Sequence, residues 1–166
     1  MGMIACYMEA EKELIDELKL QDEDEVGGSV EDLSEESDYY DMDKMWDGLH
    51  FLLVGQSTAE HLENNPLSAA IVGAEFFCDT EGADYITYIE PEMVPEICEA
   101  LSRVDIDAAL ETFSGEKFAE NEIYPDIWTK EDAEDLKEEL REAFEGLKEF
   151  YETVSENGNG VIVSIY

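Results

Sequence analysis

The stretch that decides the fold is TKEDAEDLKEELREAFEGLKEFYETVSENGNGVIVSIY, residues 129–166. Its first part, Thr129–Ser155, carries apolar side chains three or four residues apart: Ala133, Leu136, Leu140, Ala143, Phe144, Leu147, Tyr151 and Val154. That spacing predicts an amphipathic helix of about seven turns. We expect Thr129 and Asp132 to form a capping box at its start, and the glycines of Asn157–Gly160 to end it.

Apolar runs lie at both ends of the chain. Val161–Tyr166 is almost continuously β-prone, which predicts a strand covered on both faces. Met3–Met8 is a similar run and leads into a helix over Glu9–Leu20. Buried strands separated by helices indicate the α+β class. We therefore expect one domain, residues 1–166, with a small mixed sheet that includes the N- and C-terminal strands, packed with several helices and the long C-terminal helix.

The segments between these ends are shorter. Asp41–Val54 has apolar residues at helical spacing, which predicts a helix ended by Gly55. Gln21–Asp43 holds eleven acidic residues and no basic one, so a solvated loop or short polar helix is expected. Tyr85–Ile89 alternates like a strand. Residues 66–73 are expected to form a short helix or a turn, and further short helices are predicted over residues 91–101 and 105–113.

The charge of the chain restricts its partners. A formal charge of −36 results from 45 acidic and 9 basic residues, and no Lys or Arg lies between Met45 and Ser102. Nucleic acids and anionic membrane surfaces require several cations, so both are disfavoured. An acidic field attracts basic proteins, polyamines and metal cations. Adaptation to high salt is an alternative reason for the acidity, and the sequence leaves it open.

The cysteines and the hydropathy pattern favour a cytoplasmic protein. Cys6, Cys78 and Cys98 are odd in number, widely spaced and free of any CxxC pair. The start has no signal-peptide pattern. No apolar run approaches the roughly 20 residues of a membrane span. We therefore expect a protein that is neither secreted nor membrane-embedded.

One histidine has the neighbours that acid–base chemistry would need. On a helix, His50 shares a side with Trp46 and Asp47, so the Asp47 carboxylate is placed to hold the imidazole. A small hydrolase or transferase with a pocket centred on Asp47, His50 and Trp128 is one interpretation. However, no nucleophile motif accompanies these residues. The other interpretation, which we prefer, is that His50 lies at the polar edge of a core helix.

No metal or cofactor is expected. His61 lies in a polar segment without the further ligands that a zinc site needs, and we interpret it as a surface residue. Asp22–Gly27 starts like a calcium loop but has Val26 at the fifth position and Leu33 at the twelfth. A phosphate-binding lysine loop and a G-x-G-x-x-G motif are both missing.

Aromatic and methionine side chains within the acidic stretch are candidate partner anchors. Tyr39, Tyr40 and Met42 are surrounded by carboxylates, as in an interface for a basic protein. An ordinary amphipathic entry to the next helix explains them equally well. Trp128 lies just before the long helix. We expect its side chain to pack in the core, in preference to the alternative that it lines the edge of a ligand site.

In order along the chain, five segments stand out: MGMI (residues 1–4), WDGLHFLLVG (46–55), PLS (66–68), PEMV (91–94) and EIYPDIW (122–128). Together they resemble the YfbM-like family of small bacterial proteins, a domain of unknown function. Relatives have Thr-Gly where this chain has Val54-Gly55, and Gly-Gly where it has Gly73-Ala74. The resemblance implies an α+β fold and a cytoplasmic bacterial origin, and it implies no established activity.

The sequence thus favours a non-enzymatic interaction module that binds a basic protein, as an immunity protein covers a toxin. In this hypothesis Asp22–Asp43 and the Glu-rich face of Thr129–Ser155 steer association. The hydrolase or transferase remains the alternative. The pattern does not determine the oligomeric state or the identity of the partner.

Overall fold

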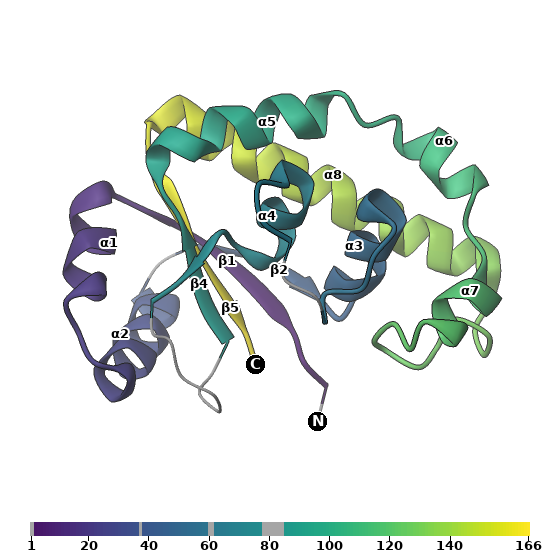
Figure 1. Ribbon diagram of the computed structural model, residues 1–166, viewed down its shortest axis with the longest axis horizontal. Coiled ribbons are helices and arrows are strands. Elements are labelled where there is room, and N and C mark those ends of the chain that lie inside the picture. The colour runs from purple at the N-terminus through teal and green to yellow at the C-terminus, as the bar shows by residue number, and fades with distance from the viewer. Residues whose placement is uncertain (1, 37, 60–61, 78–84) are drawn as a thin grey trace.

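The structure is a computed structural model that describes residues 2–36, 38–59, 62–77 and 85–166 (Figure 1). Strands and helices are interspersed along the chain. In chain order the elements are β1 (Ala5–Ala10), α1 (Lys12–Lys19), α2 (Glu23–Glu36), β2 (Tyr39–Asp43), α3 (Trp46–Val54), α4 (Pro66–Val72), β3 (Glu75–Phe76), β4 (Tyr85–Ile89), the 3-10 turn η1 (Pro91–Met93), α5 (Val94–Ser102), α6 (Ile106–Glu111), α7 (Gly115–Glu120), α8 (Ala133–Asn157) and β5 (Gly160–Ile165).

The strands form one sheet in the order β2-β1-β5-β4-β3. Each described pair is antiparallel, so the sheet is not mixed as the sequence suggested. The C-terminal strand β5 lies at the centre, between β1 and β4, and all six of its residues are buried. This confirms the prediction of a strand covered on both faces, because a central strand between two helical layers exposes neither side.

Side chains alternate between the two faces of the sheet and build two apolar clusters. Val161 and Val163 of β5 face a large cluster shared with α3, α4, α5 and α8. Ile162 faces a smaller one, which contains Ile15 of α1 and Val26 of α2. Figure 1 shows α1 and α2 apart from α3, α4, α5 and α8, on the other side of the strands. The sheet is therefore the middle of three layers.

The long helix α8 is confirmed, with a different start. Its cap is Asp132, whose carboxylate accepts hydrogen bonds from the backbone N–H groups of Glu134 and Asp135, so Thr129 lies outside the helix and forms no capping box. A carboxylate at this position also meets the positive end of the helix dipole. Gly158, with a φ of 71°, ends the helix as expected. The face from Leu136 to Val154 is buried.

Two predicted segments before α3 differ in the structure. Residues 41–43, predicted as helix, belong to β2, and the helix begins at Trp46. Residues 23–36, predicted as loop or short polar helix, form the fourteen-residue α2 despite Gly27 and Gly28. Val26 and Val30, one helical turn apart, are buried against the second face of the sheet. This tertiary burial outweighs the low helix propensity of glycine. Helix α7 and the short strand β3 were not predicted.

The buried end of α4 is capped by three hydroxyl groups from other elements. Tyr151 of α8 donates to the carbonyl of Ala70 at 2.7 Å, and Tyr7 of β1 donates to that of Ile71 at 2.7 Å. Thr87 of β4 donates to the carbonyl of Val72 at 2.8 Å. A helix C-terminus leaves its last four carbonyls without partners in the helix. Because these hydroxyl groups donate to the last carbonyl groups of α4, the helix can end inside the core without leaving those carbonyls unsatisfied.

Candidate functional site

His50 is part of a buried polar connection between α3 and α4. Its side chain is fully buried, and both ring nitrogens have partners. Nδ1 lies 2.7 Å from the Gln56 carbonyl, which can only accept, so Nδ1 carries the proton in the neutral ring. Nε2 therefore accepts from the Ser68 hydroxyl, also at 2.7 Å. Sequence reasoning missed Ser68, since no local pattern joins two residues eighteen positions apart.

Asp47 does not hold His50. One of its carboxylate oxygens accepts a hydrogen bond from the Thr58 hydroxyl at 2.8 Å, and the other accepts from the Tyr124 backbone N–H at 2.8 Å. The side chain is buried, so this buried carboxylate is satisfied by fixed donors from two loops. Asp47 thus ties the start of α3 to the segment that precedes Trp128.

Trp128 is a core residue. Its indole N–H donates to the Ile123 carbonyl at 2.9 Å, and its ring packs edge-on to Phe118 with centroids 4.8 Å apart. The ring also lies against Gly48, where a Cβ atom would come within 2.5 Å of its Cζ2 atom. The three residues of the hydrolase or transferase interpretation are therefore all buried and bonded within the fold. The observed geometry gives each a structural role.

The buried imidazole predicts a distinct pH dependence of stability. Burial lowers the pKa of His50 below its ordinary value of 6.5, although the Gln56 carbonyl and the Asp47 charge act in the opposite direction. The unfolded chain then binds the proton first as the pH falls, so the His50 contribution to stability is present above pH 6.5 and is lost toward the lower folded pKa. We expect the stability of the wild type relative to His50→Gln to decrease from pH 7.5 to 5.5, measured by urea unfolding. An unchanged difference would contradict a buried neutral ring.

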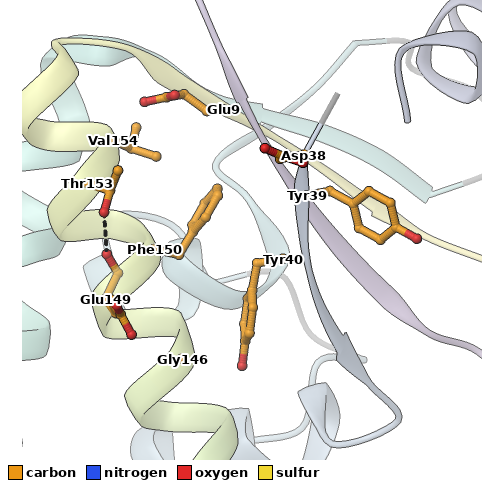
Figure 2. A pocket seen from close by; sticks show the side chains of 9 residues that line it. All are labelled: Glu9, Asp38, Tyr39, Tyr40, Gly146, Glu149, Phe150, Thr153 and Val154. Carbon is orange, nitrogen blue, oxygen red and sulfur yellow. Dashed lines mark hydrogen bonds between the residues drawn. The ribbon is translucent and has the colours of Figure 1, made fainter. Parts of the chain in front are cut away.

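A groove of about 470 Å³ lies elsewhere, between β2 and the second half of α8 (Figure 2). We call it the β2–α8 groove. Its size is in the range of sites that hold a side chain or small ligand. Three carboxylates and three aromatic residues are among its lining residues, and none is Lys or Arg. The lining residues are Glu9, Asp38, Tyr39, Tyr40, Gly146, Glu149, Phe150, Thr153 and Val154.

Tyr40 and Phe150 form the aromatic floor of this groove. Their rings are stacked, with centroids 6.2 Å apart and planes 26° from parallel. The Tyr40 hydroxyl donates to the Ala143 carbonyl of α8 at 3.0 Å. This approach requires Gly146, because a Cβ atom there would lie 2.5 Å from the Tyr40 hydroxyl oxygen and 2.7 Å from its Cε2 atom. A glycine in α8 therefore makes room for a tyrosine from the edge of the sheet.

The three candidate anchors do not form one cluster. Met42 is buried in the main core, with 4% of its surface exposed, so it cannot itself contact a partner. Tyr39 and Tyr40 are neighbours in a strand and point to opposite faces, as Figure 2 shows: Tyr40 faces α8, whereas the Tyr39 ring points away. Of the three, Tyr39 and Tyr40 line the groove, and Tyr39 is 46% exposed.

The electrostatics of the groove favour a cation. Asp38 and Glu149 are exposed, and Glu9 is half-buried with one oxygen accepting from Asn157 at 2.8 Å. Six of the basic residues are paired with acids elsewhere: Lys12, Lys19, Arg103, Lys130, Lys137 and Arg141. Burial, with Asp41 and Glu142 nearby, raises the pKa of Tyr40 to about 12, so this ring stays neutral at physiological pH. The groove thus combines neutral aromatic faces with negative charge.

The described ranges, residues 2–36, 38–59, 62–77 and 85–166, bear on metal and membrane binding. There, no three His, Cys, Asp or Glu side chains are grouped so that they could hold a metal ion. Across the same residues, no helix has both the length and the apolar character to cross a membrane. His61 lies outside the described residues, so its interpretation as a surface residue stays a prediction.

The fold and its buried polar core define an α+β domain with a central antiparallel sheet between two helical layers. The family model described as "Domain of unknown function (DUF1877)" matches residues 1–164. Protein YfbM of Escherichia coli (strain K12) is 32% identical over 135 residues, which are 81% of this chain and 80% of that protein. The chain therefore belongs to the DUF1877 family, as the resemblance to YfbM-like proteins implied.

A solved structure supports the same assignment. The crystal structure of YfbM from Escherichia coli, titled as a protein of unknown function, superposes with a TM-score of 0.79 at 25% sequence identity. The match covers 98% of this chain and 99% of that chain. The overall fold is thus shared with this relative.

Proposed function

We propose that this protein is a non-enzymatic interaction module of the cytoplasm that binds a basic protein partner. The single observation on which this rests is the β2–α8 groove, where stacked Tyr40 and Phe150 rings are bordered by the carboxylates of Glu9, Asp38 and Glu149. Aromatic anchors surrounded by charge are typical of protein interfaces. A basic partner would supply the charge that this surface lacks.

Charge supports the proposal in a second way. A protein with a net charge of −36 repels nucleic acids and anionic membranes, and it attracts basic proteins over a distance set by the salt concentration. Such steering raises the association rate, and the aromatic groove then provides short-range contacts. By covering a basic functional surface of its partner, the module would inhibit that partner, as an immunity protein does a toxin.

The test is capture of partners from the native cytoplasm at low and high salt, followed by mass spectrometry. We expect one basic protein to be retained at about 50 mM salt and largely lost at about 500 mM, where the screening length shrinks to a few ångströms. The purified partner should then bind Phe150→Leu and Glu149→Gln variants at least several-fold more weakly than wild type.

The matched control is Glu96→Gln, which removes one negative charge from an exposed position of α5 outside the groove. It should bind nearly as the wild type does. If Glu96→Gln and Glu149→Gln weaken binding equally, the groove has no special part in it. If no basic protein is retained at low salt, the proposed function is wrong.

A further inference from the structure

The edge of the sheet beside the groove offers a specific way of binding a partner. In the strand order β2 is the outermost strand on its side, and it pairs with β1 along its other edge. An outer strand presents backbone N–H and C=O groups that another extended segment can pair with. Tyr39, Asp41 and Asp43 are exposed along it. The β2 edge and the groove thus form one continuous surface.

The register determines where side chains of an added strand would lie. Tyr40 pairs with Tyr7 of β1, and these two rings lie on the same face with centroids 5.9 Å apart. Residues directly opposite each other in paired strands share a face. A residue paired with Tyr40 from the outer side would therefore also lie on the α8 face, beside the Tyr40 ring and the groove.

The acidic residues select which segment can pair there. Asp38, Asp41 and Asp43 are exposed at the β2 edge, and Glu9 and Glu149 line the groove. A second copy of this chain would bring the same charges into contact, and like charges placed directly opposite each other destabilise a strand pair. Self-pairing is therefore disfavoured. A cationic strand has the complementary charge.

The regular, strand-like part of the outer β2 edge ends after Asp41. The pairing with β1 shifts between Ala5 and Cys6, so that Met42 is an extra residue in β2. The Asp43 N–H is bonded to the Asp41 carboxylate at 2.7 Å, and the Met42 carbonyl accepts from Met45 at 3.5 Å. The regular part of the edge is consequently Tyr39–Asp41, long enough for a few paired residues.

We propose that the basic partner binds as an extended segment that adds a strand to β2 and places an arginine side chain over the β2–α8 groove. This rests on the proposed function and states its mode of recognition. The planar guanidinium would stack on the Tyr40 and Phe150 rings, with the carboxylates of Glu149 and Asp38 on its border. The Tyr39 ring, on the opposite face, would contact the residue next in the segment.

The probe is a blocked seven-residue peptide of alternating arginine and threonine, titrated by calorimetry and by NMR of the labelled protein. Alternate N–H groups of a strand point to the same edge, so two further peptides carry N-methyl groups, one on the arginines and one on the threonines. We expect one methylated peptide to bind tenfold or more weakly, because it cannot donate to β2, and the other to bind like the parent. The amides of Tyr39–Asp41 should shift on binding.

Two results would overturn strand addition. If both methylated peptides bind as well as the parent, attraction is due to charge alone, and the proposed function would stand without this mode of binding. If the parent peptide does not bind at low salt, the mode is wrong, whereas capture of a basic protein from the cytoplasm would still decide the function. The Phe150→Leu variant keeps an apolar side chain but loses the aromatic ring. It should bind the parent peptide several-fold more weakly than the wild type does.

Discussion

Replacement of Gly73 by alanine should destabilise the domain by roughly 3 kcal/mol or more. Gly73 ends α4 with a φ of 82° and a ψ of 171°, a backbone region that is essentially limited to glycine and costs about 1–3 kcal/mol for a residue with a side chain. A Cβ atom there would overlap the Thr87 hydroxyl and lie 2.5 Å from the Thr87 Cβ. Because both elements are buried, relief by movement would also break the Thr87 bond to the Val72 carbonyl, and overpacking adds about 1–3 kcal/mol.

A second helix-ending glycine serves as a control for this substitution. Gly55 ends α3 with a φ of 79° and a ψ of 10°, in the left-handed helical region that side chains tolerate better, and a Cβ atom there would meet nothing within 4 Å. Gly55→Ala should therefore cost only the backbone strain, about 1–2 kcal/mol. Urea unfolding of both variants measures the difference. Equal losses of stability for the two would show that the contact with Thr87 does not constrain the fold.

Trp128→Ala should destabilise the domain by about 3–5 kcal/mol, the usual cost of truncating a large buried aromatic residue. The ring is 3% exposed and packs against Phe118, Phe113 and Gly48. Its removal leaves a cavity between α3 and α7. The free energy of unfolding from urea denaturation gives the magnitude.

Trp128→Phe separates packing from hydrogen bonding. Phenylalanine keeps an aromatic ring against Phe118 but loses the donor to the Ile123 carbonyl. We expect it to cost about 1–3 kcal/mol, less than alanine. A folded, fully stable Trp128→Ala protein would instead be the behaviour of an exposed residue at a ligand site, and it would revive the hydrolase or transferase interpretation.

The sequence alone identified the elements whose pattern is long or unambiguous. The apolar face from Leu136 to Val154 repeats often enough that only a helix satisfies it, and Gly158 marks its end. The run Val161–Ile165 is too short and too β-branched for an amphipathic helix, which leaves a buried strand. Together these two segments determined the α+β class, and the net charge determined which classes of partner are disfavoured.

Only the tertiary structure decided the short elements and the site. The stretch around Met42 fits a helical spacing and a strand equally well, and pairing with β1 selects the strand. Helical spacing likewise predicted Asp47 as the partner of His50. In the folded chain, the partners of its ring are instead the Ser68 hydroxyl and the Gln56 carbonyl.

The groove shows the physical reason most clearly. Tyr40 reaches α8 because Gly146, more than a hundred positions later in the chain, has no side chain. Local patterns report which face of an element is apolar, since that depends on residues within a few positions. Which elements then meet, and which side chains they leave exposed between them, depends on long-range packing that no local pattern contains. The sequence therefore determined that this protein is acidic. The fold decided where acidic side chains lie beside aromatic rings, which is the β2–α8 groove.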